Sequence, residues 1–229
     1  MTIQNVILLI AGVINLIMSV IIFSRGIKNK VNLYFSLLTF FNFLWAISLL
    51  LGRNTTIDFI WYEGGAILAY SAALGIAMSL YYFSVHFPAL IIKKVRPIYN
   101  YIIVILGVIL SIVPYINNVF ILGYNKDIIR QEYNLFVNKP IYIVYSIYFI
   151  SVVLLAVYNF YSKQKILEGI FKKRIRILLL TIIIGLVFGS YFDLFICYFA
   201  NYEYSWLGPA STVFMNTYVF YLIFYTKNK

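Results

Sequence analysis

Seven apolar stretches of about 20 residues occupy nearly the whole of this 229-residue chain. A helix rises about 1.5 Å per residue, so about 20 apolar residues cross the hydrocarbon core of a bilayer, which is about 30 Å thick. We therefore predict an all-α polytopic membrane protein in which residues 1–229 form a single domain, a seven-transmembrane-helix bundle. The predicted spans are residues 3–24, 32–52, 60–87, 97–115, 140–162, 175–199 and 207–226.

The basic residues are divided unequally between the two sides of these spans. The connections after the first, third and fifth spans, together with the residues after the seventh, hold 14 of the 18 Lys and Arg. Because cytoplasmic loops carry the excess of basic residues, we predict a multi-pass protein of the cell membrane with its N-terminus outside and its C-terminus in the cytoplasm. The four basic residues on the predicted outer side are Arg53, Lys126, Arg130 and Lys139. The 14 on the predicted cytoplasmic side are Arg25, Lys28, Lys30, Lys93, Lys94, Arg96, Lys163, Lys165, Lys172, Lys173, Arg174, Arg176, Lys227 and Lys229.

The net charge of +11 could suggest a nucleic-acid partner, but its distribution argues against one. The predicted cytoplasmic side carries +13 and the outer side −2, which fits a topology signal and contact with anionic lipid head groups. The chain is 63% apolar, and its mean hydropathy of +0.92 is far above that of a soluble domain. We expect the lipid bilayer to be a partner and nucleic acid not to be one.

No motif of a known catalytic or cofactor site is present. The chain lacks HExxH, GxSxG and Walker A sequences, and its last span contains no lysine that could hold retinal. The single cysteine, Cys197, excludes an intrachain disulfide and a multi-cysteine metal site. We expect no catalytic residue, no cofactor and no metal, and therefore no enzyme in these 229 residues.

Three segments predict features of the bundle beyond the helices. Residues 116–139 on the outer side combine turn residues with an alternating apolar pattern, which predicts a small β-hairpin. The third span is rich in small residues, and small residues allow close helix packing in membranes. We therefore expect it to be the buried centre of the bundle. In the sixth span Gly185, Gly189 and Asp193 share one face, which we expect to point at protein.

Acids and aromatic residues gather in the predicted outer half, where we predict a ligand cavity between the third, sixth and seventh spans. Asp193 is the central candidate because a carboxylate inside a span needs a partner or water; a structural hydrogen bond to Tyr or Asn is the alternative. Glu63 could contact a ligand or be a solvated acid at a helix start. Tyr70, Tyr191 and Trp206 would supply aromatic walls, although Trp206 also suits an interfacial aromatic belt. Two carboxylates favour a cationic or amine-bearing ligand, or a proton.

Three segments resemble one protein family in order and spacing. They are NLYFSLLTFFNFLWAISLLL (32–51), YYFSVHFPALIIKK (81–94) and YSWLGPASTVFMNTYVFYLIFY (204–225). Together they are similar to the N-terminal seven-helix sensor region of bacterial membrane histidine kinases. The resemblance implies a sensor of an outer ligand or membrane state, joined to a cytoplasmic kinase, cyclase or PAS output. The chain ends at Lys229 without a phosphoacceptor or ATP-binding region, so the resemblance does not imply catalysis.

The sequence therefore favours a sensory receptor that passes a signal through its seventh helix to a cytoplasmic effector, in cis or in trans. The seventh span has no ionisable residue of the Asp, Glu, Lys, Arg or His type between Trp206 and Lys227, and Gly208-Pro209 at its start predicts a hinge. A small-solute transporter or channel is the alternative, because inverted repeats are not detectable at this level. A partner-binding membrane subunit is a third interpretation. The expected partners are lipid, a small outer ligand and the effector, and the sequence leaves a homodimer open.

Overall fold

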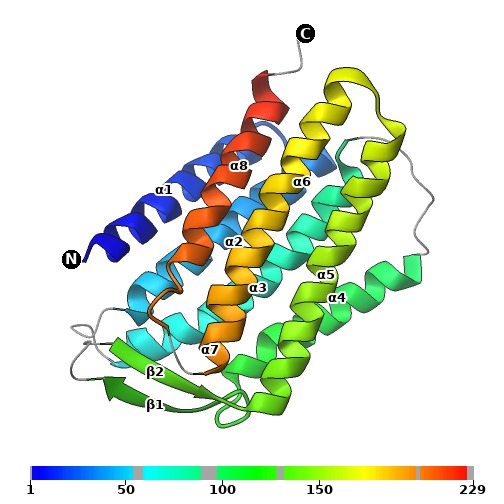
Figure 1. The fold of residues 1–229 in the computed structure, drawn as a ribbon. Coiled ribbons are helices and arrows are strands. Elements are labelled where there is room, and N and C mark those ends of the chain that lie inside the picture. The colour runs from blue at the N-terminus through cyan, green and yellow to red at the C-terminus, as the bar shows by residue number, and fades with distance from the viewer. Residues whose placement is uncertain (1, 54–58, 89–96, 128–131, 200–201, 226–229) are drawn as a thin grey trace.

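The computed structural model describes residues 2–53, 59–88, 97–127, 132–199 and 202–225. Within them the chain forms seven helices of 16 to 28 residues and one small sheet (Figure 1). The long helices are α1 (Ile3–Ser24), α2 (Lys30–Gly52), α3 (Phe59–His86), α4 (Pro97–Ile112), α5 (Lys139–Ile166), α6 (Gly169–Gly189) and α8 (Leu207–Tyr225). The shorter elements are a 3₁₀-helix η1 (Val113–Tyr115), strands β1 (Ile121–Asp127) and β2 (Glu132–Val137), a π-helix η2 (Ser190–Phe195) and α7 (Ile196–Tyr198).

The predictions of a helical chain and of a hairpin within residues 116–139 are confirmed. Five helices are long and apolar enough to cross a membrane: Ile3–Ser24, Lys30–Gly52, Glu63–His86, Lys139–Ile166 and Gly169–Tyr198. Many large apolar side chains of α5 point outward, such as Val144, Ile147 and Leu154, each at least half exposed. Such a surface suits hydrocarbon rather than water.

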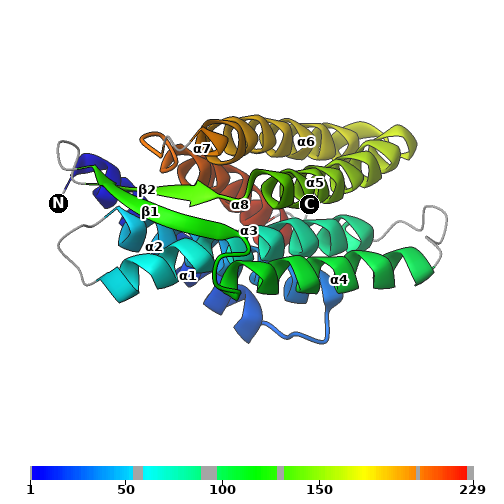
Figure 2. The same ribbon diagram turned by 90° about the horizontal axis from the view of Figure 1, so that it is seen from below.

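The helices run back and forth between two ends of the bundle. One end, which we call the hairpin end, carries the sheet, the N-terminus and the 202–206 loop. The hairpin lies across this end of the helices (Figure 2). The guanidinium of Arg53 joins α1 to the 202–206 loop, since it donates to Gln4 Oε1 at 2.6 Å and to Tyr202 O at 3.1 Å. The opposite end carries the turn after α1, the end of α3 and the end of α8 (Figure 1).

Helix α3 is the most buried helix among the candidate spans. In its most apolar window 67% of the residues are buried, against 22 to 44% in the other four. Ala72 and Ala77 have no exposed surface, and α3 contacts α2, α4 and α5. The small side chains allow this close approach, so the prediction that the third span is central is confirmed.

The hairpin is part of the core rather than a loose cover. Its apolar residues Phe120 and Leu135 are buried against Tyr70 of α3 and Tyr142 and Tyr145 of α5. The Tyr70 and Phe120 rings meet edge to face with centroids 4.8 Å apart, and the Tyr145 hydroxyl donates to Tyr70 O at 2.7 Å. This aromatic cluster fixes the sheet on the ends of α3 and α5.

Candidate functional site

The π-helix η2 places Asp193 inside the bundle. After Gly189 the α-helical pattern of α6 widens into the π-helical turn Ser190–Phe195. The Tyr142 hydroxyl of α5 contacts two carbonyls of this turn, donating to Leu194 O at 3.0 Å and to Asp193 O at 3.2 Å. Short π-helical segments within α-helices are frequent at functional sites. The turn is held by α5, and Asp193 is held with it.

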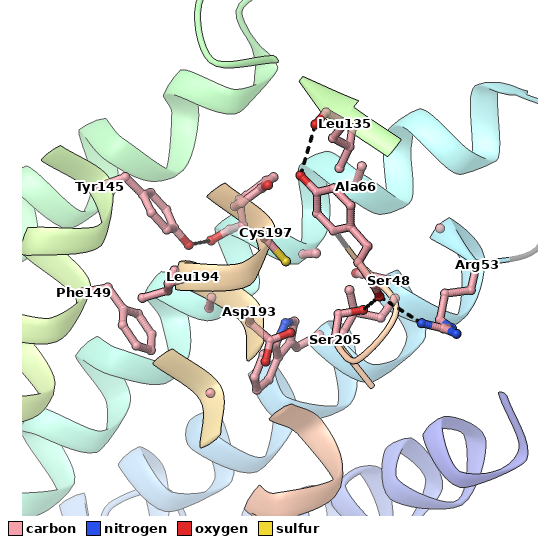
Figure 3. A pocket seen from close by; sticks show the side chains of 18 residues that line it. Ser48, Arg53, Ala66, Leu135, Tyr145, Phe149, Asp193, Leu194, Cys197 and Ser205 are labelled. Atoms are coloured by element: carbon pink, nitrogen blue, oxygen red, sulfur yellow. Dashed lines mark hydrogen bonds between the residues drawn. The ribbon is translucent and has the colours of Figure 1, made fainter. Parts of the chain in front are cut away.

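A cavity of about 90 Å³ lies beside Asp193, close to the hairpin end. Its lining comes from α2, α3, β2, α5, α6, η2, α7 and the 202–206 loop, so residues far apart in the sequence meet here (Figure 3). The lining is mostly apolar, and five aromatic side chains contribute to it: Trp45, Tyr70, Tyr145, Phe149 and Tyr202. The site is therefore a cavity rich in aromatic side chains with one acid in its wall.

The Asp193 carboxylate has no hydrogen-bond partner among the described residues, and both of its oxygens are fully buried. It packs against Gly208, the second residue of α8. A Cβ placed on Gly208 would overlap with Asp193 Oδ2 and would lie 2.6 Å from Trp45 Cη2. Only glycine fits at this position without displacing one of those side chains. Asp193 is therefore in direct contact with the first turn of α8.

A second cavity of about 50 Å³ adjoins the first and extends away from the hairpin end. The two share Trp45, Ala73, Phe149 and Gly189 in their linings. The second is lined mostly by aliphatic residues, among them Ile76, Leu80, Val153 and Ile182. Gly185 and Gly189 face this space, and a Cβ on Gly185 would meet nothing within 4 Å. The glycine face of α6 points into the protein as predicted, but it borders a cavity instead of a tightly packed helix.

The 202–206 loop closes the first cavity at the hairpin end. Arg53 holds the loop through Tyr202 O and Glu203 O, both at 3.1 Å from Nη1. The Tyr202 hydroxyl donates to Leu135 O of β2 at 3.3 Å, and burial raises the pKa of this hydroxyl well above its usual range. The loop is thus bonded to both α2 and the sheet.

The opposite end of the bundle is densely packed and its buried cation is satisfied. Phe83 of α3 stacks on Phe87 at 5.1 Å and packs against Phe160 of α5 at 5.9 Å between ring centroids. The Lys163 ammonium donates to Ser84 O and Val85 O at 2.9 Å, and also to the carbonyls of Phe87 and Pro88. These carbonyls end α3 and would otherwise lack partners.

The structure brings together two of the five predicted site residues, since Tyr70 and Asp193 both line the first cavity. Glu63 lies apart and accepts a hydrogen bond from the Tyr124 hydroxyl of β1 at 3.2 Å. Burial and the Glu63 charge raise the pKa of Tyr124. Tyr191 is 51% exposed and lines an outward groove beside Ser190, while Trp206 does not line the cavity. Their role in ligand binding stays a prediction.

Three cavity-lining aromatic residues were missed at the sequence level: Trp45, Tyr145 and Phe149. Tyr145 and Phe149 are four residues apart on α5, a spacing that places both on one helix face. That spacing could have been found in the sequence. The position of Trp45 could not have been found in the sequence, because it depends on how α2 lies beside Gly189 of α6 and Gly208 of α8.

No family model and no curated protein matches this chain. Within the described residues, no group of three or more His, Cys, Asp or Glu could hold a metal ion.

Proposed function

We propose that this chain is a membrane sensory domain of the histidine-kinase seven-helix type. It receives a small ligand at the hairpin end, on the outer side, and passes the signal through α8 to a cytoplasmic effector without catalysis of its own. The contact between Asp193 and Gly208 carries this proposal, because it joins the candidate site directly to the proposed output helix. A ligand that changes the position of the Asp193 carboxylate or of Trp45 acts on the first turn of α8.

A hydrogen bond in the middle of α8 gives such a movement a pivot. The Asn216 amide donates to Asn15 Oδ1 of α1 at 2.7 Å, and both residues are fully buried. After Asn216, α8 continues to Tyr225, and the Tyr218 hydroxyl donates to Arg174 O at 3.3 Å. A displacement at Gly208 would therefore be expressed as a tilt or rotation near Tyr225. For such a change to be a response, the ligand has to bind the two packings with different affinity.

The charge distribution supports the proposed orientation. The N-terminus and the hairpin lie at one end, and the described basic residues of the turn after α1 and of the start of α6 lie at the other (Figure 1). With the excess of basic residues inside, the hairpin end faces outward and all seven long helices cross the bilayer.

The packing of the opposite end supports a receptor over a small-solute transporter. A transporter needs a midplane site that can be reached from both sides. Here the Phe35, Phe83 and Phe160 rings are fully buried between the cavities and the opposite end, and the Lys163 ammonium is bonded to the end of α3.

A fusion experiment tests the proposal. A kinase reporter is joined in helical phase after Tyr225, and one to four residues are inserted at the junction. We expect reporter activity to vary with helical phase, because each inserted residue rotates the reporter by about 100°. Activity that is indifferent to phase, or purified protein that moves solute across liposome membranes, would favour the transporter.

A further inference from the structure

Among the described residues, the acid in the cavity wall has no positive partner. An ionised carboxylate in apolar surroundings is costly unless a cation or several donors compensate it. Both Asp193 oxygens are fully buried and without a hydrogen-bond partner among the described residues. Arg53 lines the same cavity, but its Nη1 donates to the 202–206 loop and its Nη2 to Gln4. The compensating charge can come from a bound molecule.

The shape and lining of the two cavities restrict that molecule. Trp45, Tyr70, Tyr145 and Phe149 surround the space beside the acid, and aromatic faces attract cations as well as apolar groups. The adjoining cavity is mostly aliphatic and has a volume of about 50 Å³, compared with about 90 Å³ for the first. An apolar cavity of about 150 Å³ is known to hold a benzene molecule. These volumes suit a molecule with few carbon atoms.

We propose that the site binds a small primary amine, with its ammonium group on the Asp193 carboxylate and its hydrocarbon tail in the cavity lined by Ile76, Val153 and Ile182. The ammonium supplies a positive charge and three N–H donors, which the two buried oxygens lack. The tail replaces empty volume along α3 and α6 with van der Waals contacts. This proposal rests on the proposed function in one respect, the assumption that the cavity is a receptor site. Binding of the amine is measured directly, without any signalling output.

The test uses the purified full chain in lipid nanodiscs, with n-hexylamine as the probe and 1-hexanol as a neutral molecule of equal length. Binding is measured as a concentration-dependent rise in the unfolding temperature. We expect n-hexylamine to raise it at lower concentration than 1-hexanol. In Asp193→Asn the amine affinity should fall about tenfold or more, since a charge-assisted interaction is lost. Glu168→Gln, which removes an exposed carboxylate outside both cavities, should bind as the wild type does.

A second variant tests the position of the tail. Gly185 borders the second cavity and has open space around its Cβ position. Gly185→Leu should therefore fill that cavity, weakening n-hexylamine binding while leaving ethylamine binding intact. Gly64→Leu is the matched control, because Gly64 is exposed, also has open space and lines neither cavity.

Three results would overturn the ligand class. The first is equal binding of n-hexylamine and 1-hexanol, and the second is an unchanged amine affinity in Asp193→Asn. The third is an unfolding temperature that rises at low pH but does not rise with n-hexylamine. If n-hexylamine does not bind but the activity of the fused reporter varies with helical phase, the amine is rejected as the ligand and the proposed receptor function is kept. If n-hexylamine binds but the activity of the fused reporter does not vary with helical phase, the amine site is kept and the proposed receptor function is rejected.

Discussion

Lys163 and Asp193 are both buried ionisable side chains, one near each end of the bundle, yet their surroundings differ completely. The Lys163 ammonium has four carbonyl acceptors at the end of α3, at 2.9 to 3.2 Å. The Asp193 carboxylate has no hydrogen-bond donor among the described residues and borders a cavity. Removing a buried charge that is fully bonded leaves its partners unsatisfied and destabilises the fold, whereas a buried charge left without donors is itself costly. The comparison separates a structural charge from one placed for a ligand.

The largest expected effect is at Lys163. Replacing it with Met keeps most of the side-chain volume but leaves the carbonyls of Ser84 and Val85 without their donor. We expect Lys163→Met to lower the free energy of unfolding by about 2–4 kcal/mol, measured by denaturant titration in detergent micelles. Lys165→Met is the control, because Lys165 is exposed and has a cation–π contact with Tyr161 at 4.5 Å; its effect should stay below about 1 kcal/mol. Equal stability of the two variants would contradict a structural role for Lys163.

A smaller effect is expected at the contact between the cavity and α8. The Cβ introduced by Gly208→Ala would overlap with Asp193 and press on Trp45, so one of them has to move. Overpacking of this kind costs about 1–3 kcal/mol. In the control, Gly185→Ala, the new methyl group has open space, and the higher helix propensity of Ala should leave stability unchanged or raised. If both variants are equally stable in thermal unfolding, Asp193 does not contact α8 as described.

The smallest loss of stability is expected at Asp193 itself. Asp193→Asn removes an uncompensated charge without breaking a hydrogen bond among the described residues, so the free energy of unfolding should stay the same or rise. The reporter fused after Tyr225 should nevertheless lose its response to n-hexylamine. A large loss of stability would show that the carboxylate is a structural group, and would remove the contrast with Lys163.

Much of the fold could be predicted because it depends on local patterns. Apolar length gave α1 at residues 3–24 and α8 from residue 207, and the alternation after residue 120 gave the hairpin. Pro97 is the first residue of α4 and Pro140 is the second residue of α5, and in the first turn of a helix a missing N–H costs little.

The site could be predicted only in part, because its geometry depends on contacts between distant segments. The π-helix η2 was not predicted, and its carbonyls bond to the Tyr142 hydroxyl of another helix. Glu63 was predicted as a ligand contact because it is an acid in the outer half. In the structure its carboxylate accepts a hydrogen bond from Tyr124 of the hairpin, a contact that the sequence does not reveal. In the sequence, Lys163 is one of the basic residues that predict the topology. Its hydrogen bonds to the end of α3 are known only from the structure, because they depend on how α5 packs beside α3.

The most direct test of the central claim is a distance measured between α8 and α5 at the end opposite the cavity. Spin labels are placed at Tyr221 of α8 and Tyr158 of α5, which are 53% and 65% exposed, in a Cys197→Ser background. We predict that n-hexylamine shifts the distance distribution in the otherwise unmodified chain and leaves it unchanged when Asp193→Asn is added. An unchanged distribution in protein that demonstrably binds the amine would contradict the account, because the ligand would then not act on α8.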